Sequence, residues 1–308
     1  TPVARKMAKD LGVDIQTLLG SGPNGRIMKD DIKNAFESKQ KPKADMVTRE
    51  QDTTNNSSQE PKHVHTQSQV INIDSNAVEQ IPMTMLRKTI AKNMTLSKFT
   101  IPHTAAMDEV NVTRLVQYRA EVNKMLESAD TRLTYMPFII KAIAIALKAH
   151  PIINASVDME REVILLKKDY NIGMATDTPD GLMVPILKHA DRMSIIELSK
   201  EIKRLGEAAK HKSLTIKDLE GGTFTVTNYG AIGALYGVPV IKSPEVAILG
   251  IGTIYKKPAV GDDDTFVIQD TLPLSISFDH RVVDGADAGR FLQTLKKLLA
   301  NPDLLLLS

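Results

Sequence analysis

The chain has 308 residues, of which 42% are hydrophobic and 25% charged, a composition typical of a globular protein with roughly two domains. Lys and Arg number 39 against 37 Asp and Glu, so the formal net charge is only +2, and we expect no nucleic-acid partner. Cysteine is absent, which excludes disulfides, thiolate nucleophiles and thiolate-metal sites. No run of about 18 apolar residues occurs, so no membrane span is expected.

The first predicted unit covers residues 1–37 and holds two short helices. The first helix carries the apolar residues Met7, Ala8 and Leu11, and the second is predicted at 29–36. Helices of this length bury little surface, so the unit is near the lower size limit for independent folding. Such a unit is more plausibly kept for docking than for chemistry.

The loop between these helices has the spacing G-x-G-x-x-G over residues 20–25. This spacing is also found in dinucleotide-binding proteins, where it follows a strand and opens a helix. No strand is predicted before the loop, and Pro23, Asn24 and Gly25 are typical of a turn. We therefore expect no dinucleotide site here.

A polar segment follows, and we predict a flexible linker over residues 38–79. Its lack of aromatic residues means that it cannot bury enough apolar surface to offset the entropy cost of ordering. His63 and His65 lie in this segment without further metal-ligating residues nearby. We interpret them as solvated histidines, and no metal site is predicted.

The region 80–308 combines long helices with several strands, which predicts a single α/β domain with a mixed sheet. The helix at 135–149 is apolar nearly all round, as buried helices are. In chain order, helices are predicted from Thr84 onward and at 111–128, 135–149, 194–209 and after Asp284, and strands at 103–110, 170–176, 182–187, 223–228, 246–251, 265–268 and 274–278.

The strongest candidate for chemistry is the segment S-F-D-H-R-V-V-D-G, in which an apolar strand ends at His280 and Asp284 opens a helix. A histidine held at a strand end can act as a general base near neutral pH. The alternative is structural: Asp284 is a good helix N-cap and His280 can be a histidine that serves only in hydrogen bonding.

H-x-x-x-D-G is the signature of the coenzyme A-dependent acyltransferase superfamily, which includes chloramphenicol acetyltransferase. The longer run DHRVVDGADAGRF resembles the catalytic domain of dihydrolipoamide acyltransferases, the core subunits of 2-oxo acid dehydrogenase complexes. ARKMAKDLGVDI and GSGPNGRIMKDDI resemble the peripheral-subunit-binding domain of this family, and LRKTIAKNM, IPHTAAMDEVNVT, DTPDGLMVPILKHAD, GGTFTVTNYGAIG and SPEVAILGIG resemble successive blocks of its catalytic domain. The resemblance implies a chloramphenicol acetyltransferase-like mixed-sheet domain preceded by a small helical docking domain.

The resemblance implies acyl transfer between dihydrolipoamide and coenzyme A, which is a substrate here. His280 would remove the thiol proton, and Thr227, in the block F-T-V-T-N, would donate to the oxyanion. The alternative for Thr227 is an ordinary strand threonine. Asp284 would orient the histidine loop, with Arg87 or Arg281 as its ionic partner. The family builds its site between neighbouring subunits, so His280 and Thr227 can come from different chains.

The resemblance also implies partners. Arg5, Lys6, Lys9 and Arg26 would contact acidic patches on the 2-oxo acid dehydrogenase subunit or on dihydrolipoamide dehydrogenase. Lys9 replaces a common arginine, and lysine lacks the bidentate fork, which favours a weaker contact. The alternative is a solvated basic face. Homotrimers of the family assemble into cores of 24 or 60 subunits.

The lipoyl group is expected on a lipoyl domain that this sequence does not contain, so we expect the natural chain to continue upstream of Thr1. The alternative is a lipoyl group carried on another polypeptide. Residues 230–243 are expected to line the acyl pocket. We slightly favour branched-chain acyl groups, with acetyl transfer in the pyruvate dehydrogenase complex and a non-catalytic scaffold as alternatives. The bacterial cytoplasm is the expected location, with the mitochondrial matrix as the alternative.

Overall fold

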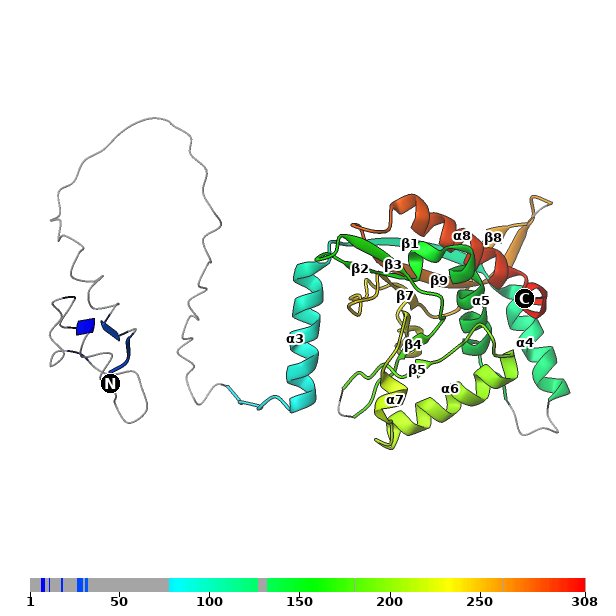
Figure 1. Ribbon diagram of the computed structural model, residues 1–308. Helices are drawn as coiled ribbons and strands as arrows, with labels where there is room; N and C mark the ends of the chain where they lie inside the picture. Colours follow the sequence, from blue (N-terminus) through cyan, green and yellow to red (C-terminus); the bar gives the residue numbers. More distant parts are fainter. Residues whose placement is uncertain are drawn as a thin grey trace, which may run out of the picture. The chain divides into compact units, whose positions relative to one another are not determined.

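The computed structural model divides into two compact units, Thr1–Asp74 and Ser75–Ser308 (Figure 1). We describe each unit by itself. The described residues are 7–8, 11, 18, 27–29, 31–32, 78–126, 132–179, 181–261 and 263–307.

The first unit has a small apolar core. Ala8 and Ile32 are buried, and their apolar neighbours are Met7, Leu11, Leu18 and Ile27. The Leu11 N–H donates to the Met7 carbonyl at 3.0 Å, as in a helical turn. The predicted apolar side of the first helix is therefore confirmed by its burial.

The second unit contains six helices and nine strands among its described residues. The helices are α3 (Met85–Thr100), α4 (Thr113–Met125), α5 (Met136–Ala149), α6 (Ile195–Lys210), α7 (Ile216–Leu219) and α8 (Gly285–Ala300), with short 3-10 turns at Pro151–Ile153, Gly230–Ile232 and Pro302–Leu306. The strands are β1 (His103–Asn111), β2 (Ala155–Asp158), β3 (Val163–Leu166), β4 (Ile172–Ala175), β5 (Ile186–Leu187), β6 (Phe224–Asn228), β7 (Ala247–Ile251), β8 (Tyr255–Val260) and β9 (Phe266–Asp279).

The main sheet has seven strands in the order β1-β9-β7-β6-β4-β5, and β8 also pairs with β9. β4, β6 and β7 run parallel, whereas β9 is antiparallel to β1, β7 and β8. β2 and β3 form a separate two-stranded sheet. The predicted mixed α/β architecture is therefore confirmed.

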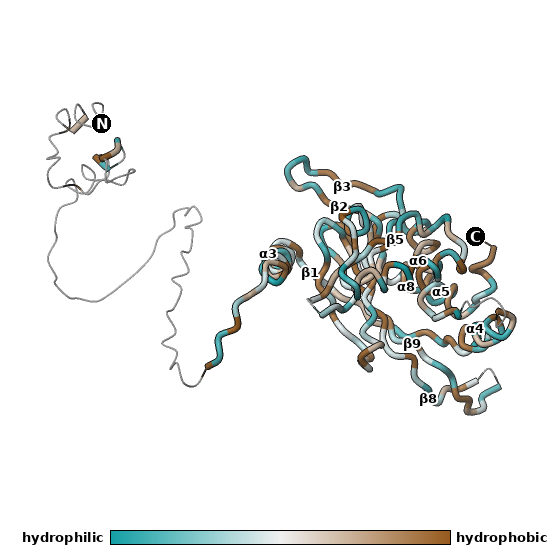
Figure 2. The backbone as a smooth tube through the Cα atoms, turned by 90° about the horizontal axis from the view of Figure 1, so that it is seen from below, coloured by the Kyte–Doolittle hydropathy of each residue, from teal (hydrophilic) through white to brown (hydrophobic). Residues whose placement is uncertain are grey.

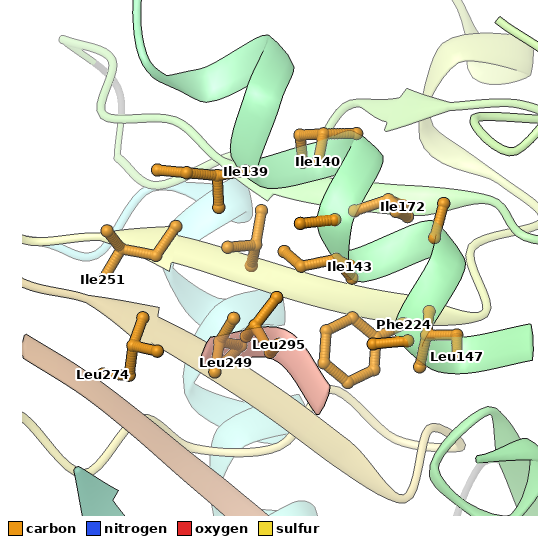
Figure 3. Close-up of a cluster of buried hydrophobic side chains, with 14 of the residues drawn as sticks. Ile139, Ile140, Ile143, Leu147, Ile172, Phe224, Leu249, Ile251, Leu274 and Leu295 are labelled. Carbon is orange, nitrogen blue, oxygen red and sulfur yellow. The ribbon is translucent and has the colours of Figure 1, made fainter. Parts of the chain in front are cut away.

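The core lies on one face of this sheet, beneath helices α4, α5, α6 and α8. α5 is buried on most sides, as its continuous apolar sequence predicts. Figure 3 shows how the helix side chains Ile139, Ile140, Ile143, Leu147 and Leu295 meet the strand side chains Ile172, Phe224, Leu249, Ile251 and Leu274.

Helix starts follow the polar residues that precede them. The Thr84 hydroxyl accepts a hydrogen bond from the Arg87 N–H at 3.2 Å at the start of α3. At α6, Ser194 and Glu197 form the predicted capping box, in which each side chain accepts from the backbone N–H of the other. In two views at right angles, α3 lies at the opposite end of the unit from α4 and the C-terminus (Figures 1 and 2).

Some strand predictions were wrong in extent. The two strands expected at 265–268 and 274–278 form the single strand β9, whose polar centre and Pro273 interrupt the apolar pattern. The strand expected at 182–187 shrinks to two residues, because Pro185 has no N–H to donate. β2, β3 and β8 were not predicted.

The opposite face of the sheet carries a different set of side chains. Strand residues alternate between faces, so Thr225 and Thr227 of β6 point away from the helices while Phe224 and Val226 join the core. Ile248 of β7 likewise joins a separate small cluster with Ile101 and Ile241. This second face carries the candidate site.

Candidate active site

His280 lies immediately after the buried end of β9. Its backbone N–H donates to the Pro102 carbonyl at 3.2 Å, and its ring lies 5.7 Å from the ring of the buried Phe278. The side chain remains 47% exposed, and the imidazole makes no hydrogen bond within the described residues. The backbone is therefore held while the ring stays available to take a proton.

Asp284 is the charged group that faces His280. The distance from its Oδ1 to the His280 Nδ1 is 3.8 Å, which is too long for a hydrogen bond. Asp284 occupies the N-cap position of α8, but its side chain makes no capping hydrogen bond. Asp284 therefore faces His280 without a hydrogen bond to it and without capping α8 through its side chain.

The turn that carries His280 is held by Asp279 and Arg281, whose pairing was not predicted. Asp279 is 1% exposed, and its carboxylate accepts from the Arg281 backbone N–H, Nε and Nη2 at 3.0, 3.0 and 2.6 Å. This carboxylate raises the pKa of the Arg281 guanidinium. Arg281 is therefore not the partner of Asp284, and among the described residues Arg87 forms no ion pair with Asp284 either.

Thr227 lies near the end of β6 at the wall of a cavity of about 420 Å³. The Tyr229 ring, another part of that wall, packs over Gly250, where any Cβ would overlap it. The lining residues are mostly apolar: Met94, Ala175, Leu182, Val184, Thr225, Thr227, Tyr229, Gly237, Val238, Pro239, Val240, Lys242 and Ile248.

Within one chain, His280 and Thr227 lie far apart. Thr227 pairs with Gly250, which pairs with Ser275, so these three residues form one row across the sheet. His280 is five residues beyond Ser275, about 17 Å along β9, and two strand spacings add about 10 Å sideways, giving roughly 20 Å in all. Two side chains that act on one carbonyl must both approach it within about 3 Å. One chain therefore does not bring the two residues to the same reacting atoms.

A buried carboxyl group, that of Glu245, interacts with two residues of the cavity wall. Glu245 is only 4% exposed, and burial raises its pKa to about 7, opposed by the Thr225 hydroxyl and the Lys242 ammonium. Both of these neighbours line the cavity. Sequence reasoning missed Glu245, because its burial follows from tertiary packing of the segment before β7.

Other predicted features fall outside what the structure can place. Arg5, Lys6, Lys9 and Arg26 lie outside the described residues, as do the two linker histidines. Within the described part of the chain, no three acidic or histidine side chains gather closely enough to hold a metal ion. None of the described helices is long and apolar enough to span a membrane.

Known proteins resemble the whole chain. The dihydrolipoyllysine-residue acetyltransferase component of the pyruvate dehydrogenase complex of Acholeplasma laidlawii is 46% identical over 308 residues, which cover 100% of this chain and 55% of that protein. The same component of Staphylococcus epidermidis is 40% identical over 316 residues, covering 99% of this chain and 70% of that protein. The chain therefore spans about half to two thirds of these relatives.

Solved structures agree. The dihydrolipoamide acetyltransferase of Azotobacter vinelandii, studied for the role of one serine, one histidine and one asparagine in its catalytic mechanism, is 36% identical with a TM-score of 0.72. The match covers 74% of this chain and 94% of that chain. The cubic core of a pyruvate dehydrogenase multienzyme complex matches with the same identity, TM-score and coverage.

Family models divide the chain as its fold does. The model of the e3 binding domain matches residues 1–33. The model of the 2-oxoacid dehydrogenases acyltransferase catalytic domain matches residues 75–307, most of the chain. The chain therefore belongs to the 2-oxoacid dehydrogenase acyltransferase family and carries an e3 binding domain ahead of its catalytic domain.

Proposed function

We propose that this chain transfers an acetyl group between dihydrolipoamide and coenzyme A as the core subunit of a pyruvate dehydrogenase complex. The observation that carries the proposal is His280, an exposed imidazole on a fully anchored turn, in a chain of this family. The relatives are acetyltransferases, which supports the acetyl alternative over the branched-chain preference expected from sequence motifs.

The reaction requires a base and a donor to the oxyanion. His280 removes the proton from the attacking thiol through Nε2, the ring nitrogen that does not face Asp284. The thiolate attacks the thioester carbonyl, and the Thr227 hydroxyl donates to the oxygen of the tetrahedral intermediate. The intermediate then expels the second thiolate, which takes the proton back from the imidazolium.

Thr227 acts in the site of a neighbouring subunit in this proposal. The separation of roughly 20 Å between Thr227 and His280 along the sheet supports this arrangement. In the A. vinelandii protein the histidine and the asparagine are four residues apart, as His280 and Asp284 are here. Asp284 thus takes the position of that asparagine and attracts the imidazolium that forms during proton transfer.

The proposed partners follow the same family. The e3 binding domain, with Arg5, Lys6, Lys9 and Arg26, docks acidic surfaces of the dehydrogenase and dihydrolipoamide dehydrogenase subunits. Homotrimers assemble into a 24-subunit core, which the likeness to a cubic core supports. A lipoyl domain presents the lipoyl group to the site. The relatives are bacterial, which favours the cytoplasm over the mitochondrial matrix.

The test is a His280→Ala variant assayed with acetyl-CoA and dihydrolipoamide. Loss of a general base lowers turnover by about 10²–10⁴-fold, and we expect a fall in this range with normal assembly in sedimentation. A His211→Ala variant is the matched control, because His211 is an exposed histidine at the end of α6. Near-normal turnover in His280→Ala would contradict the proposal.

A further inference from the structure

The backbone of Ile241 is held by hydrogen bonds at both its N–H and its carbonyl. The Ile241 N–H donates to the His103 Nε2 at 3.0 Å, and the Ile241 carbonyl accepts from the buried Ser97 hydroxyl at 2.6 Å. The Ile241 side chain is itself fully buried, between Ile101 and Ile248. We call His103 and Ser97 the Ile241 clamp.

The clamp requires one form of the histidine. The His103 Nδ1 lies 2.8 Å from the Ile101 carbonyl, which can only accept, so Nδ1 carries a proton. Nε2 receives the Ile241 N–H and must therefore be unprotonated. His103 is thus a neutral ring with both nitrogens occupied, which suits a positioning role and excludes a role as base in this geometry.

The clamp fixes the position of the cavity wall that residues 238–242 form. Residues 238–242 belong to no helix or strand, so no ladder of backbone hydrogen bonds fixes them. Four of these residues, all except Ile241, line the cavity. Other lining residues, such as Ala175 of β4 and Thr227 of β6, belong to strands that the hydrogen bonds of the sheet hold in place. The width of the cavity therefore depends on how firmly Ile241 is held.

We propose that His103 and Ser97 are positioning residues for acyl selectivity, because they fix the wall at residues 238–242 and with it the shape of the cavity beside Thr227. This inference rests on the proposed acyl transfer. At about 420 Å³ the cavity does not exclude branched acyl groups by volume alone, so the position of the wall beside Thr227 is what favours an acetyl group. Releasing the clamp lets the wall move outward and accommodates branched chains.

The clamp acts on the cavity rather than on the base. Pro102, which directly precedes His103, also supports His280, because its carbonyl accepts from the His280 N–H. That contact is a backbone hydrogen bond, which a change of the His103 or Ser97 side chain leaves in place. A variant of the clamp therefore changes the choice of acyl group while His280 remains on its turn.

The test compares kcat/KM for acetyl-CoA and isobutyryl-CoA in the full chain. In His103→Leu and in Ser97→Ala, we expect the isobutyryl-to-acetyl ratio to rise about tenfold or more, within the range of 10–200-fold that one methylene group commands in a shaped pocket. His103→Gln is the conservative variant, because its side-chain carbonyl can accept from the Ile241 N–H, and we expect it to restore most of the original ratio.

Thr294→Ala is the matched control, because it removes a hydroxyl bonded to another half-buried histidine, His150, at 2.7 Å, and we expect an unchanged ratio. A wild-type chain inactive with both substrates would refute the proposed function. An active wild type whose ratio is unchanged in both clamp variants would refute this inference. If His103→Leu fails to fold, Ser97→Ala decides alone, since it removes only one hydroxyl.

Discussion

At His280 the restraint comes from the neighbouring residues. Asp279 fixes the turn through Arg281 and through the N–H groups of Val282 and Val283, which donate to its carbonyl at 3.0 and 2.9 Å. The imidazole itself is left without a hydrogen-bond partner in the described structure. A base must exchange its proton with a substrate thiol, so a ring already committed to strong partners, like that of His103, serves that purpose poorly.

Glu245 predicts a pH dependence of stability. Its pKa is about 7 in the folded chain against 4.5 for an ordinary glutamate, so between these pH values the folded state keeps a proton that the unfolded state releases. The contribution of this group to the free energy of unfolding is therefore fully present below pH 4.5. It is lost as the pH rises to about 7, where the buried carboxyl group ionises. As the pH rises from 4.5 to 8, we expect the free energy of unfolding of Glu245→Gln to increase relative to wild type by on the order of 3 kcal/mol.

Urea unfolding of both chains at pH 4.5 and pH 8 measures this change. Glu160→Gln is the control, because Glu160 is exposed in a turn and its carboxylate meets water in both states. We expect the stability difference of that variant from wild type to be the same at both pH values. A Glu245→Gln difference that is also independent of pH would show that the carboxyl group keeps its ordinary pKa.

The individual site residues differ in how far the sequence could predict them. His280 and Asp284 could be predicted from the sequence, because they follow directly after an apolar strand and precede a helix. Thr227 needed the family motif, since a strand threonine is otherwise ordinary. His103 could not be recognised, because its role depends on Ile241, which lies 138 residues further along the chain. Asp279 was missed although its partner Arg281 is only two residues away, because its burial follows from the pairing of β9 with β1 and β7.

At the scale of elements, local signals predicted helices well and strands less well. Helix starts depend on residues three apart, as with Thr84 and Arg87, so the sequence contains them directly. Strands depend on partners that are distant in the chain. β9 continues through Pro273 because β1 and β8 pair along different parts of it. β2 and β3 were missed because each has only four residues and they pair only with each other.

The α6 capping box gives a prediction for one element. Ser194→Ala removes the hydroxyl that accepts from the Glu197 N–H at 3.2 Å, and loss of such a cap costs about 1 kcal/mol. We expect a lower urea midpoint and unchanged transfer activity, because α6 covers the core face of the sheet. Ser199→Ala, within the same helix, is the control and should lose no stability, since alanine favours helix. Equal midpoints for Ser194→Ala and wild type would contradict the assigned cap.

At the scale of the whole molecule, length predicted roughly two domains, whereas the described chain has two very unequal units. The near-neutral net charge of the whole chain could not distinguish the e3 binding domain from the catalytic domain. The geometry of the active site could not be predicted either, because no pattern along one chain shows that His280 and Thr227 are roughly 20 Å apart across the sheet. That separation follows from strand order, and under the proposed mechanism it requires a second chain to complete each site.

Subunit complementation tests this consequence. A His280→Ala chain and a Thr227→Ala chain are each expected to be nearly inactive alone. When the two are co-expressed, some interfaces of the mixed trimers combine His280 of one variant with Thr227 of the other, and these sites are intact. We expect such mixtures to recover a clear fraction of wild-type turnover, measured with acetyl-CoA and dihydrolipoamide. A mixture of purified, preassembled variants is the control and should stay inactive. If both residues served one site within a single chain, every site would carry one defect, and co-expression would recover nothing.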